Sequence, residues 1–271
     1  MERSTGRGGA GESLAAADEV TTTQAPPVGR RPSALAMAWV VVADYAYAAV
    51  WHTRALVARD VPKQYAHGDR SRPAVILIPG VYETWMFLKP VADRLNADGY
   101  RIRVARGLGY NRRPIRDTSA RLARALGRLS ANPAGSIVVA HSKGGLIGKD
   151  LLVTGRGHSG IRGVVAVCSP FAGSRLARYV LDPSLREFDP HDETIVALSG
   201  ESGVNADIVS IYGVFDPHVP EGSVLHGATN VLLPVSGHFR ILGRPELVDA
   251  VQLAVDGFSD ADAAAAAANA R

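Results

Sequence analysis

Residues 136–145 read SIVVAHSKGG, and this stretch decides the fold. Its first half is a continuous apolar run, as expected of a strand that is buried on both faces. Small residues follow, and they open an apolar helical segment over 144–153. A serine at 142, with Ala140 and Gly144 two residues to either side, is typical of a nucleophile elbow, a sharp turn that only small neighbours allow.

Two other interpretations of this stretch can be weighed. A turn of small residues between a strand and a helix occurs in many α/β proteins without any catalytic role. The run GGLIGKD at 144–150 also has a faint likeness to a phosphate-binding loop. It lacks the correctly spaced first glycine, and Asp150 stands where a Ser or Thr should hold magnesium, so we reject a phosphate loop.

Further apolar runs predict strands on both sides of this stretch, at 74–79, 101–105, 164–168, 207–215 and 230–235. Helical periodicity occupies the intervals between them, at 83–96, 118–129 and 245–255. This alternation predicts an α/β fold with a mostly parallel sheet of about six strands and helices on both faces. We assign residues 61–256 to this domain and find no internal repeat.

The two ends of the chain differ from the domain. Residues 1–32 and 257–271 lack the apolar periodicity of a packed segment, and we predict disordered tails there. Residues 33–60 form an apolar N-terminal helix. Within it, 33–51 is nearly long enough to span a membrane, but Asp44 interrupts the run and tyrosines and a tryptophan follow. A helix packed on the domain or lying at a membrane surface is the favoured interpretation, with a membrane span or cleaved signal as the alternative.

Charge and cysteine content limit the partners. The net charge is +4, yet the arginines are scattered and no basic-aromatic stripe accompanies them, so nucleic acid is not an expected partner. Cys168 is the only cysteine, which rules out an intramolecular disulfide and a cysteine-rich zinc site. We expect a cytoplasmic protein that could associate with a membrane through residues 33–51, with secretion as the alternative.

Two candidate partners for Ser142 follow later strands. Asp216 comes directly after 207–215, in FDPHVP, and His238 comes directly after 230–235, in SGHF. The carboxyl ends of parallel strands meet at one edge of the sheet, so these side chains are expected together. Each also has an ordinary interpretation, because Asp216 could start a turn before Pro217 and His238 could lie in a surface loop. Serine, acid and histidine in this order nevertheless predict a nucleophile, an orienting acid and a base.

Such chemistry also needs hydrogen-bond donors for an oxyanion. We predict the backbone N–H of Lys143, directly after the serine, and that of Val81, in the loop after 74–79. Gly80 allows that loop to approach closely. Among the other histidines, His218 is close to Asp216 in sequence, His141 should point to the other side of its strand end, and His191 falls in a flap-like segment.

Five motifs carry a resemblance to a known family: IPGVYETW, AHSKGGL, CSPFAGS, FDPHVP and SGHF. Over about 73–255 the chain resembles the α/β-hydrolase superfamily, in its lipase- and esterase-like branch. The resemblance implies that Ser142 is the nucleophile, His238 the base and Asp216 the acid, with Gly80, Val81 and Lys143 at the oxyanion-hole positions.

The chain departs from the family pattern at four places. Ala140 replaces a glycine, Pro79-Gly80 stands where many lipases have His-Gly, and the segment 169–174 lacks a histidine of the branch. The interval 61–72 has no room for the family's opening antiparallel hairpin. We therefore expect a minimal α/β-hydrolase fold.

The expected activity is hydrolysis of a carboxylic ester through an acyl-enzyme on Ser142, with no metal and no organic cofactor. The substrate is a small ester with a hydrophobic acyl group, covered by residues 174–194 if they form a flap rather than an ordinary connecting helix. The alternatives are acyl transfer or amide or thioester cleavage by the same residues, and a non-catalytic binding protein on the same fold.

Overall fold

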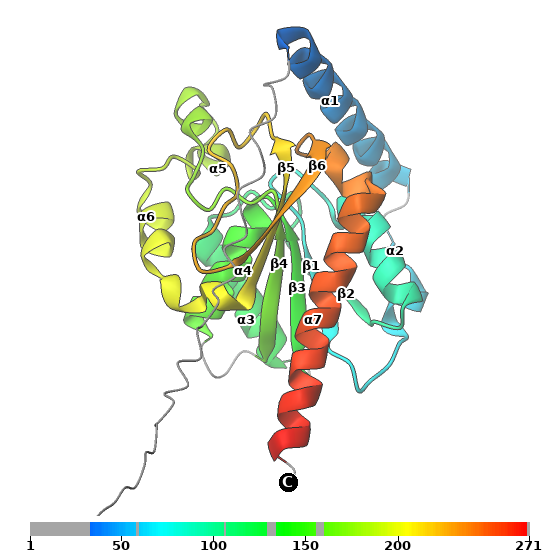
Figure 1. The fold of residues 1–271 in the computed structure, drawn as a ribbon. Helices are drawn as coiled ribbons and strands as arrows, with labels where there is room; N and C mark the ends of the chain where they lie inside the picture. The colour runs from blue at the N-terminus through cyan, green and yellow to red at the C-terminus, as the bar shows by residue number, and fades with distance from the viewer. Residues whose placement is uncertain (1–32, 58–59, 106, 129–133, 156–159, 270–271) are drawn as a thin grey trace, which may run out of the picture.

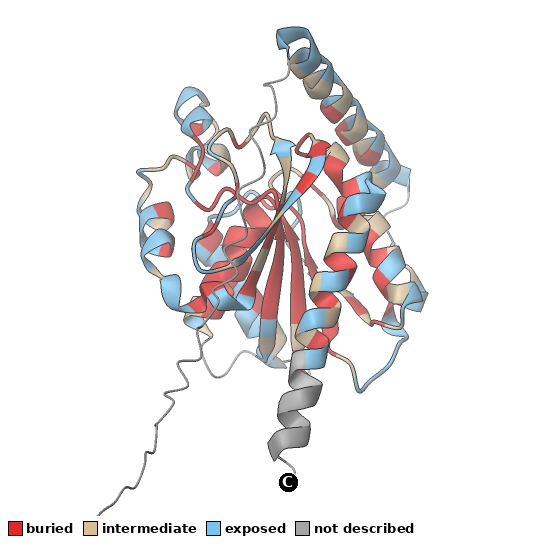
Figure 2. Ribbon diagram, viewed as in Figure 1, coloured by how far each residue is buried: buried red, intermediate tan, exposed pale blue. Residues whose placement is uncertain are grey.

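Successive side chains of the central strands point to opposite faces of one sheet, and both faces are buried (Figure 2). In β1 (Ala74–Ile78), Val75 and Leu77 face one core while Ile76 and Ile78 face the other. The same alternation occurs in β3 (Ser136–His141) and β4 (Ile161–Val167). A strand buried on both sides has no polar face, which explains the continuous apolar runs of the sequence.

The computed structural model describes residues 33–57, 60–105, 107–128, 134–155 and 160–269. Its sheet has six strands in the order β2-β1-β3-β4-β5-β6, with β2 at Ile102–Val104, β5 at Ile208–Phe215 and β6 at Thr229–Ser236. All five neighbouring pairs are parallel. The predicted six-stranded α/β architecture is therefore confirmed. The predicted tail 1–32 lies outside the described residues.

Helices cover the two faces separately (Figure 1). On one face lie α2 (Lys89–Ala97) and α7 (Pro245–Asn269), which contact each other, and on the other lie α3 (Ile115–Arg128) and α4 (Lys143–Thr154). The helix predicted over 83–96 is divided into a 3₁₀ turn, η2 (Trp85–Leu88), and α2. Pro90 sits in the first turn of α2, where its missing N–H costs no helical hydrogen bond.

The carboxyl ends of the strands carry most of the irregular segments (Figure 1). After β4 the chain forms η3 (Arg175–Tyr179) and α5 (Pro183–Arg186), then α6 (Glu193–Gly200) and η4 (Ser202–Asp207). After β6 it forms η5 (Arg240–Gly243), and a further short turn, η1 (Lys63–Ala66), precedes β1. We call residues 174–194 the flap, as in the sequence analysis.

The N-terminal helix α1 (Ala34–Val57) packs at the carboxyl end of the sheet and contacts η2 and η5. Asp44, Ala48 and Trp51 are its buried residues, whereas its first half extends beyond the body of the protein (Figures 1 and 2). By length and composition it could cross a membrane. Large apolar side chains are exposed along it: Leu35, Trp39, Val42, Tyr45, Val50, Leu56 and Val57.

The last helix is longer than the sequence predicts. The pattern ends at 255 and the segment 257–271 is expected to be disordered, but α7 continues to Asn269. Asp256 accepts a hydrogen bond from the Tyr100 hydroxyl at 2.6 Å, and the ring of Phe258 occupies the space beside Gly163. These contacts anchor one further turn, and the alanines beyond it have the highest helix propensity of any residue.

Candidate active site

Ser142 occupies a strained turn between β3 and α4. Its φ of 50° and ψ of −119° lie outside the regions that residues with a side chain normally adopt. Two backbone hydrogen bonds hold the turn, from Ser142 N to Val167 O at 2.8 Å and from Gly145 N to Ser142 O at 3.0 Å. Strain of this kind persists only where the surroundings fix it, and it is concentrated at functional sites.

The small residues around Ser142 have steric reasons. A Cβ added at Gly144 would lie 2.3 Å from the carbonyl oxygen of Ile78, and one at Gly145 would lie 2.0 Å from Ser169 Oγ. The Cβ at Gly144 would also come within 3.2 Å of the Ala140 Cβ. An alanine at 140 is therefore accommodated because residue 144 is a glycine, which accounts for the departure noted in the sequence.

His238 and Asp216 form a buried pair at the ends of β6 and β5. His238 Nδ1 and Asp216 Oδ2 are 2.7 Å apart, and the two side chains are 5% and 7% exposed. The other carboxylate oxygen, Oδ1, accepts hydrogen bonds from the backbone N–H groups of His218 and Val219. With Nδ1 bound to Asp216, the nitrogen of the His238 ring that Asp216 does not bind is Nε2.

The charges of this pair reinforce each other. Burial works to raise the pKa of Asp216, but the adjacent His238 and the two backbone N–H donors lower it to about 2. Burial works to lower the pKa of His238, and the carboxylates of Asp216, Glu83 and Asp44 overcome it and raise that pKa above the ordinary value. Asp216 thus stays ionised throughout the range in which His238 titrates.

A second buried pair lies behind His238. His141 Nδ1 is 2.7 Å from Glu83 Oε1, and His141 Nε2 is 2.9 Å from the carbonyl oxygen of His238. Since a carbonyl only accepts, Nε2 carries a proton and donates it there. Glu83 Oε2 accepts from Gly80 N at 2.8 Å. This chain of contacts connects the Gly80 loop to the His238 loop. Neither Glu83 nor this role of His141 was predicted from the sequence.

The flap is attached to the same region by two side chains. Lys143 is fully buried, and its Nζ contacts Glu187 Oε2 at 2.9 Å and the Arg113 carbonyl oxygen at 2.7 Å. Burial lowers the pKa of Lys143, although Glu187 opposes that shift. Tyr82, beside Val81, donates a hydrogen bond from its hydroxyl to the Asp182 carboxylate. Lys143, directly after Ser142, and Tyr82, two residues after Gly80, therefore both hold the flap in place.

A cavity of about 690 Å³ lies under the flap, and Ser142, His238 and Val81 line it. Its other walls come from α1 and from the flap and are mostly apolar; they include Val41, Tyr45, Ala48, Leu176, Ala177, Val180, Leu185 and Phe188. Mainly apolar pockets with a few converging polar groups are the usual form of small-molecule sites. The structure thus brings Ser142, His238, Asp216, Val81 and the backbone of Lys143 to one place.

The remaining histidines have other surroundings. His218 lines the cavity, and burial together with the neighbouring His238 lowers its pKa to about 4. His191 is exposed on the flap beside Asp189. His141 was expected to point away from the site, and this prediction is wrong: its ring centroid is 4.7 Å from that of His238.

One group of side chains has the spacing of possible metal ligands. One ligand atom each from His141, Cys168 and His238 lie within 4.8 Å of one another. Both ring nitrogens of His141 and one of His238 are already hydrogen-bonded, and burial raises the pKa of the Cys168 thiol well above its ordinary value. The set therefore presents a single free imidazole nitrogen and a protonated thiol, which fits a metal ion poorly.

Comparisons with known proteins support the fold. Lipase B of Aspergillus fumigatus superposes with a TM-score of 0.52 at 20% sequence identity, over 64% of this chain and 47% of the lipase. A carboxylesterase of the thaumarchaeon Nitrososphaera gargenis superposes with a TM-score of 0.50 at 16% identity, over 72% of this chain and 94% of the esterase. The chain spans about half the length of the lipase and nearly all of the carboxylesterase.

No family model and no curated protein matches the sequence, so the likeness rests on structure. At such identities it establishes the arrangement of strands and helices and leaves the chemistry to be argued from the site. Both neighbours are α/β-hydrolases, and the six-stranded parallel sheet with helices on both faces agrees with that fold. The chain therefore has the α/β-hydrolase fold, in a short form with six parallel strands.

Proposed function

We propose that this protein is a serine hydrolase that cleaves carboxylic esters. One observation carries the proposal: the strained Ser142 borders the same mainly apolar cavity as His238, whose Nδ1 is paired with the buried Asp216. A serine hydroxyl is a weak nucleophile unless a base takes its proton, and a histidine serves as base when a third group fixes its tautomer. Asp216 is bound to Nδ1, which leaves Nε2 for the serine proton.

The proposed reaction has two halves. Ser142 Oγ attacks the ester carbonyl carbon while its proton moves to His238 Nε2, and the carbonyl oxygen becomes an oxyanion that the Val81 and Lys143 N–H groups stabilise. Collapse breaks the bond to the alcohol, which leaves with the proton from Nε2. Water then attacks the acyl-enzyme by the same route and releases the acid. Each N–H donor contributes about 3–4 kcal/mol to the transition state.

The test is the intact mass after treatment with a fluorophosphonate. Wild type should gain one adduct, and Ser142→Ala should gain none while unfolding at an unchanged temperature. Ser199→Ala is the matched control, because its hydroxyl donates to the Ile195 carbonyl within α6, away from the cavity. A folded wild type that gains no adduct, or a Ser142→Ala variant that still does, would refute the proposal.

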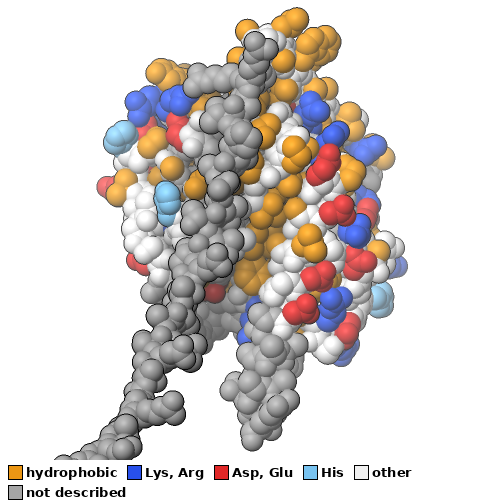
Figure 3. All heavy atoms as spheres, in the orientation of Figure 1, with side chains coloured by type: hydrophobic (Ala, Val, Ile, Leu, Met, Phe, Trp, Pro, Cys, Tyr) orange, Lys and Arg blue, Asp and Glu red, His pale blue; other side chains and the backbone are white. Residues whose placement is uncertain are grey.

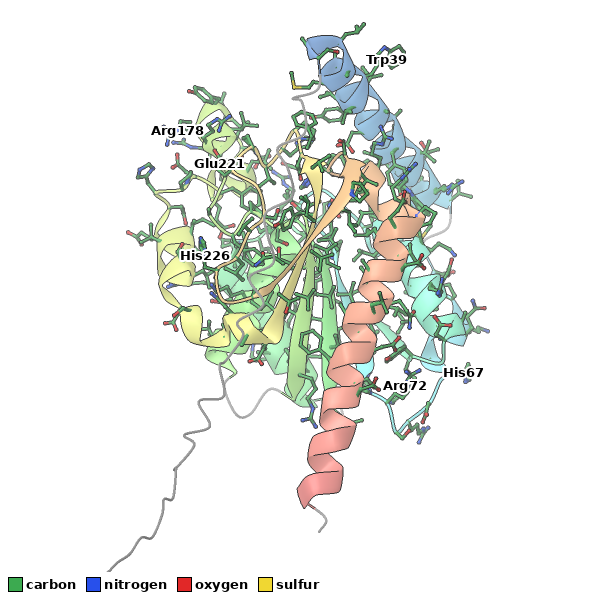
Figure 4. All side chains as sticks on the ribbon, viewed as in Figure 1. Trp39, His67, Arg72, Arg178, Glu221 and His226 are labelled. Carbon is green, nitrogen blue, oxygen red and sulfur yellow. The ribbon has the colours of Figure 1, made fainter. Side chains whose placement is uncertain are left out.

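The cavity walls suggest a hydrophobic acyl group, and the exposed side chains suggest contact with a lipid surface. Trp39 and Leu35 on α1 and Tyr179 and Leu181 on the flap are exposed, and their segments border the same cavity. Hydrophobic side chains gather at the outer end of α1 (Figure 3), where Trp39 points away from the body of the protein (Figure 4). Such side chains insert at a membrane interface. Long-chain esters should then be hydrolysed faster than acetate esters, and phospholipid vesicles should sediment the protein. Fast acetate hydrolysis with no vesicle binding would contradict this part of the proposal.

A further inference from the structure

An acidic residue stands in the middle of the apolar helix α1. Asp44 is fully buried, although α1 is otherwise apolar enough to pass as a membrane-spanning helix. A buried carboxylate is costly unless hydrogen-bond donors compensate it. Its partners should therefore show why the helix carries it.

The hydrogen-bond donors to Asp44 belong to the loop that carries His238, while His218 Nε2 lies 3.8 Å from its other oxygen, Oδ2. Asp44 Oδ1 accepts hydrogen bonds from Phe239 N at 2.8 Å and from Arg240 N at 2.9 Å. These are the two backbone donors that directly follow the histidine, at the start of η5. The contact spans 195 positions of sequence, so no local element provides it.

The same oxygen also limits the residue before His238. A Cβ added at Gly237 would lie 2.6 Å from Asp44 Oδ1, and the φ of Gly237 is +115°, which favours glycine. Asp44 therefore adjoins the backbone on both sides of His238. His141 holds the carbonyl of His238 from another direction, and Asp216 holds the ring.

We propose that Asp44 is a positioning residue: its carboxylate fixes the 237–240 turn and thereby the direction of His238 Nε2, so that α1 is part of the catalytic site. The inference rests on the proposed serine hydrolase activity. A helix cleaved off as a signal would take with it this anchor and one wall of the cavity. Displacement of a catalytic group by about 1 Å can cost about 100-fold in rate.

Two substitutions separate hydrogen bonding from mere packing. Asp44→Asn keeps an oxygen that can accept from both N–H groups, whereas Asp44→Leu keeps the branched outline of the side chain with larger methyl groups and leaves both donors unpaired. With a p-nitrophenyl ester, Asp44→Leu should lower kcat by about 10- to 100-fold with KM within about threefold. Asp44→Asn should remain within about threefold of wild type in both constants.

The matched control is Trp51→Leu, a loss of packing on the same helix at a residue that does not line the cavity. It should lower the unfolding temperature and leave kcat near wild type. If Asp44→Leu does not fold, Asp44→Thr replaces it, because the shorter hydroxyl cannot reach both donors.

The proposal would be overturned by a folded Asp44→Leu or Asp44→Thr with wild-type kcat, by an Asp44→Asn as slow as Asp44→Leu, or by an equal loss of kcat in Trp51→Leu. Fluorophosphonate labelling of wild type distinguishes this from failure of the proposed function. If wild type is neither labelled nor active, the proposed hydrolase activity is refuted. If wild type is labelled and Asp44→Leu is labelled equally fast, only the positioning role of Asp44 is refuted.

Discussion

Replacement of Gly144 by alanine tests the steric account of the serine turn. The new Cβ would lie 2.3 Å from the Ile78 carbonyl oxygen, and since real Cβ atoms almost never come within 3.0 Å, the backbone must move by about 0.7 Å. Overpacking of this kind costs about 1–3 kcal/mol. The higher helix propensity of alanine returns up to about 1 kcal/mol.

We therefore expect Gly144→Ala to lose about 1–2 kcal/mol of unfolding free energy, a fall of about 2–8 °C in Tm. Because Ser142 lies two residues away, fluorophosphonate labelling should slow at least tenfold. Gly127→Ala in α3 is the matched control: nothing lies within 4 Å of its added Cβ, so its stability should be unchanged or slightly raised. Unfolding followed by circular dichroism and a labelling time course measure both effects. A Gly144→Ala variant with wild-type Tm and labelling rate would refute the reasoning.

Two further residues give sharp expectations. Asp216→Asn should lower kcat by about 10⁴-fold with little change in KM. The acid limb of the residual pH–rate profile should move to lower pH, because the carboxylate that raises the pKa of His238 is gone; an unmoved limb would contradict this. Asp216 ionises with a pKa near 2 in the folded state, so wild type should also lose stability as pH falls from about 4 toward 2, and Asp216→Asn should lose less over that window, as urea titrations can measure. Glu83→Gln should retain most of its activity, since an amide can accept from Gly80 and donate to His141, whereas Glu83→Leu should lose at least tenfold in kcat; equal losses in the two would refute the role of the Glu83 contacts.

The sequence predicts what local patterns control. The sheet follows from apolar runs of strand length, and Ser142, Asp216 and His238 follow from their positions directly after three of those runs. Parallel strands bring their carboxyl ends to one edge whatever the loops do, so candidate residues there can be found without knowledge of the packing.

Contacts between distant segments could not be predicted in this way. Glu83 contacts His141 at the end of β3, 58 positions away, and Asp44 contacts the backbone of Phe239, 195 positions away. No periodicity of the sequence specifies such partners. The chemistry of the two residues is the signal that could have found them. Asp44 is an acid inside an apolar helix, and Glu83 closely follows the glycine turn after a buried strand. The extent of α7 was missed because Phe258 finds its place against Gly163 only in the folded chain.

The contact between Asp44 and the 239–240 backbone can form only after both segments have been synthesised. At about 5–20 residues per second, the ribosome adds Phe239 about 10–40 s after Asp44. For that interval α1 has left the ribosome, or is leaving it, with its apolar side chains and its carboxylate unpartnered. The helix can therefore bind a chaperone or a bilayer before the surface on which it packs has been synthesised. The 237–240 turn takes its final form only when α1, which is synthesised early, meets this later segment.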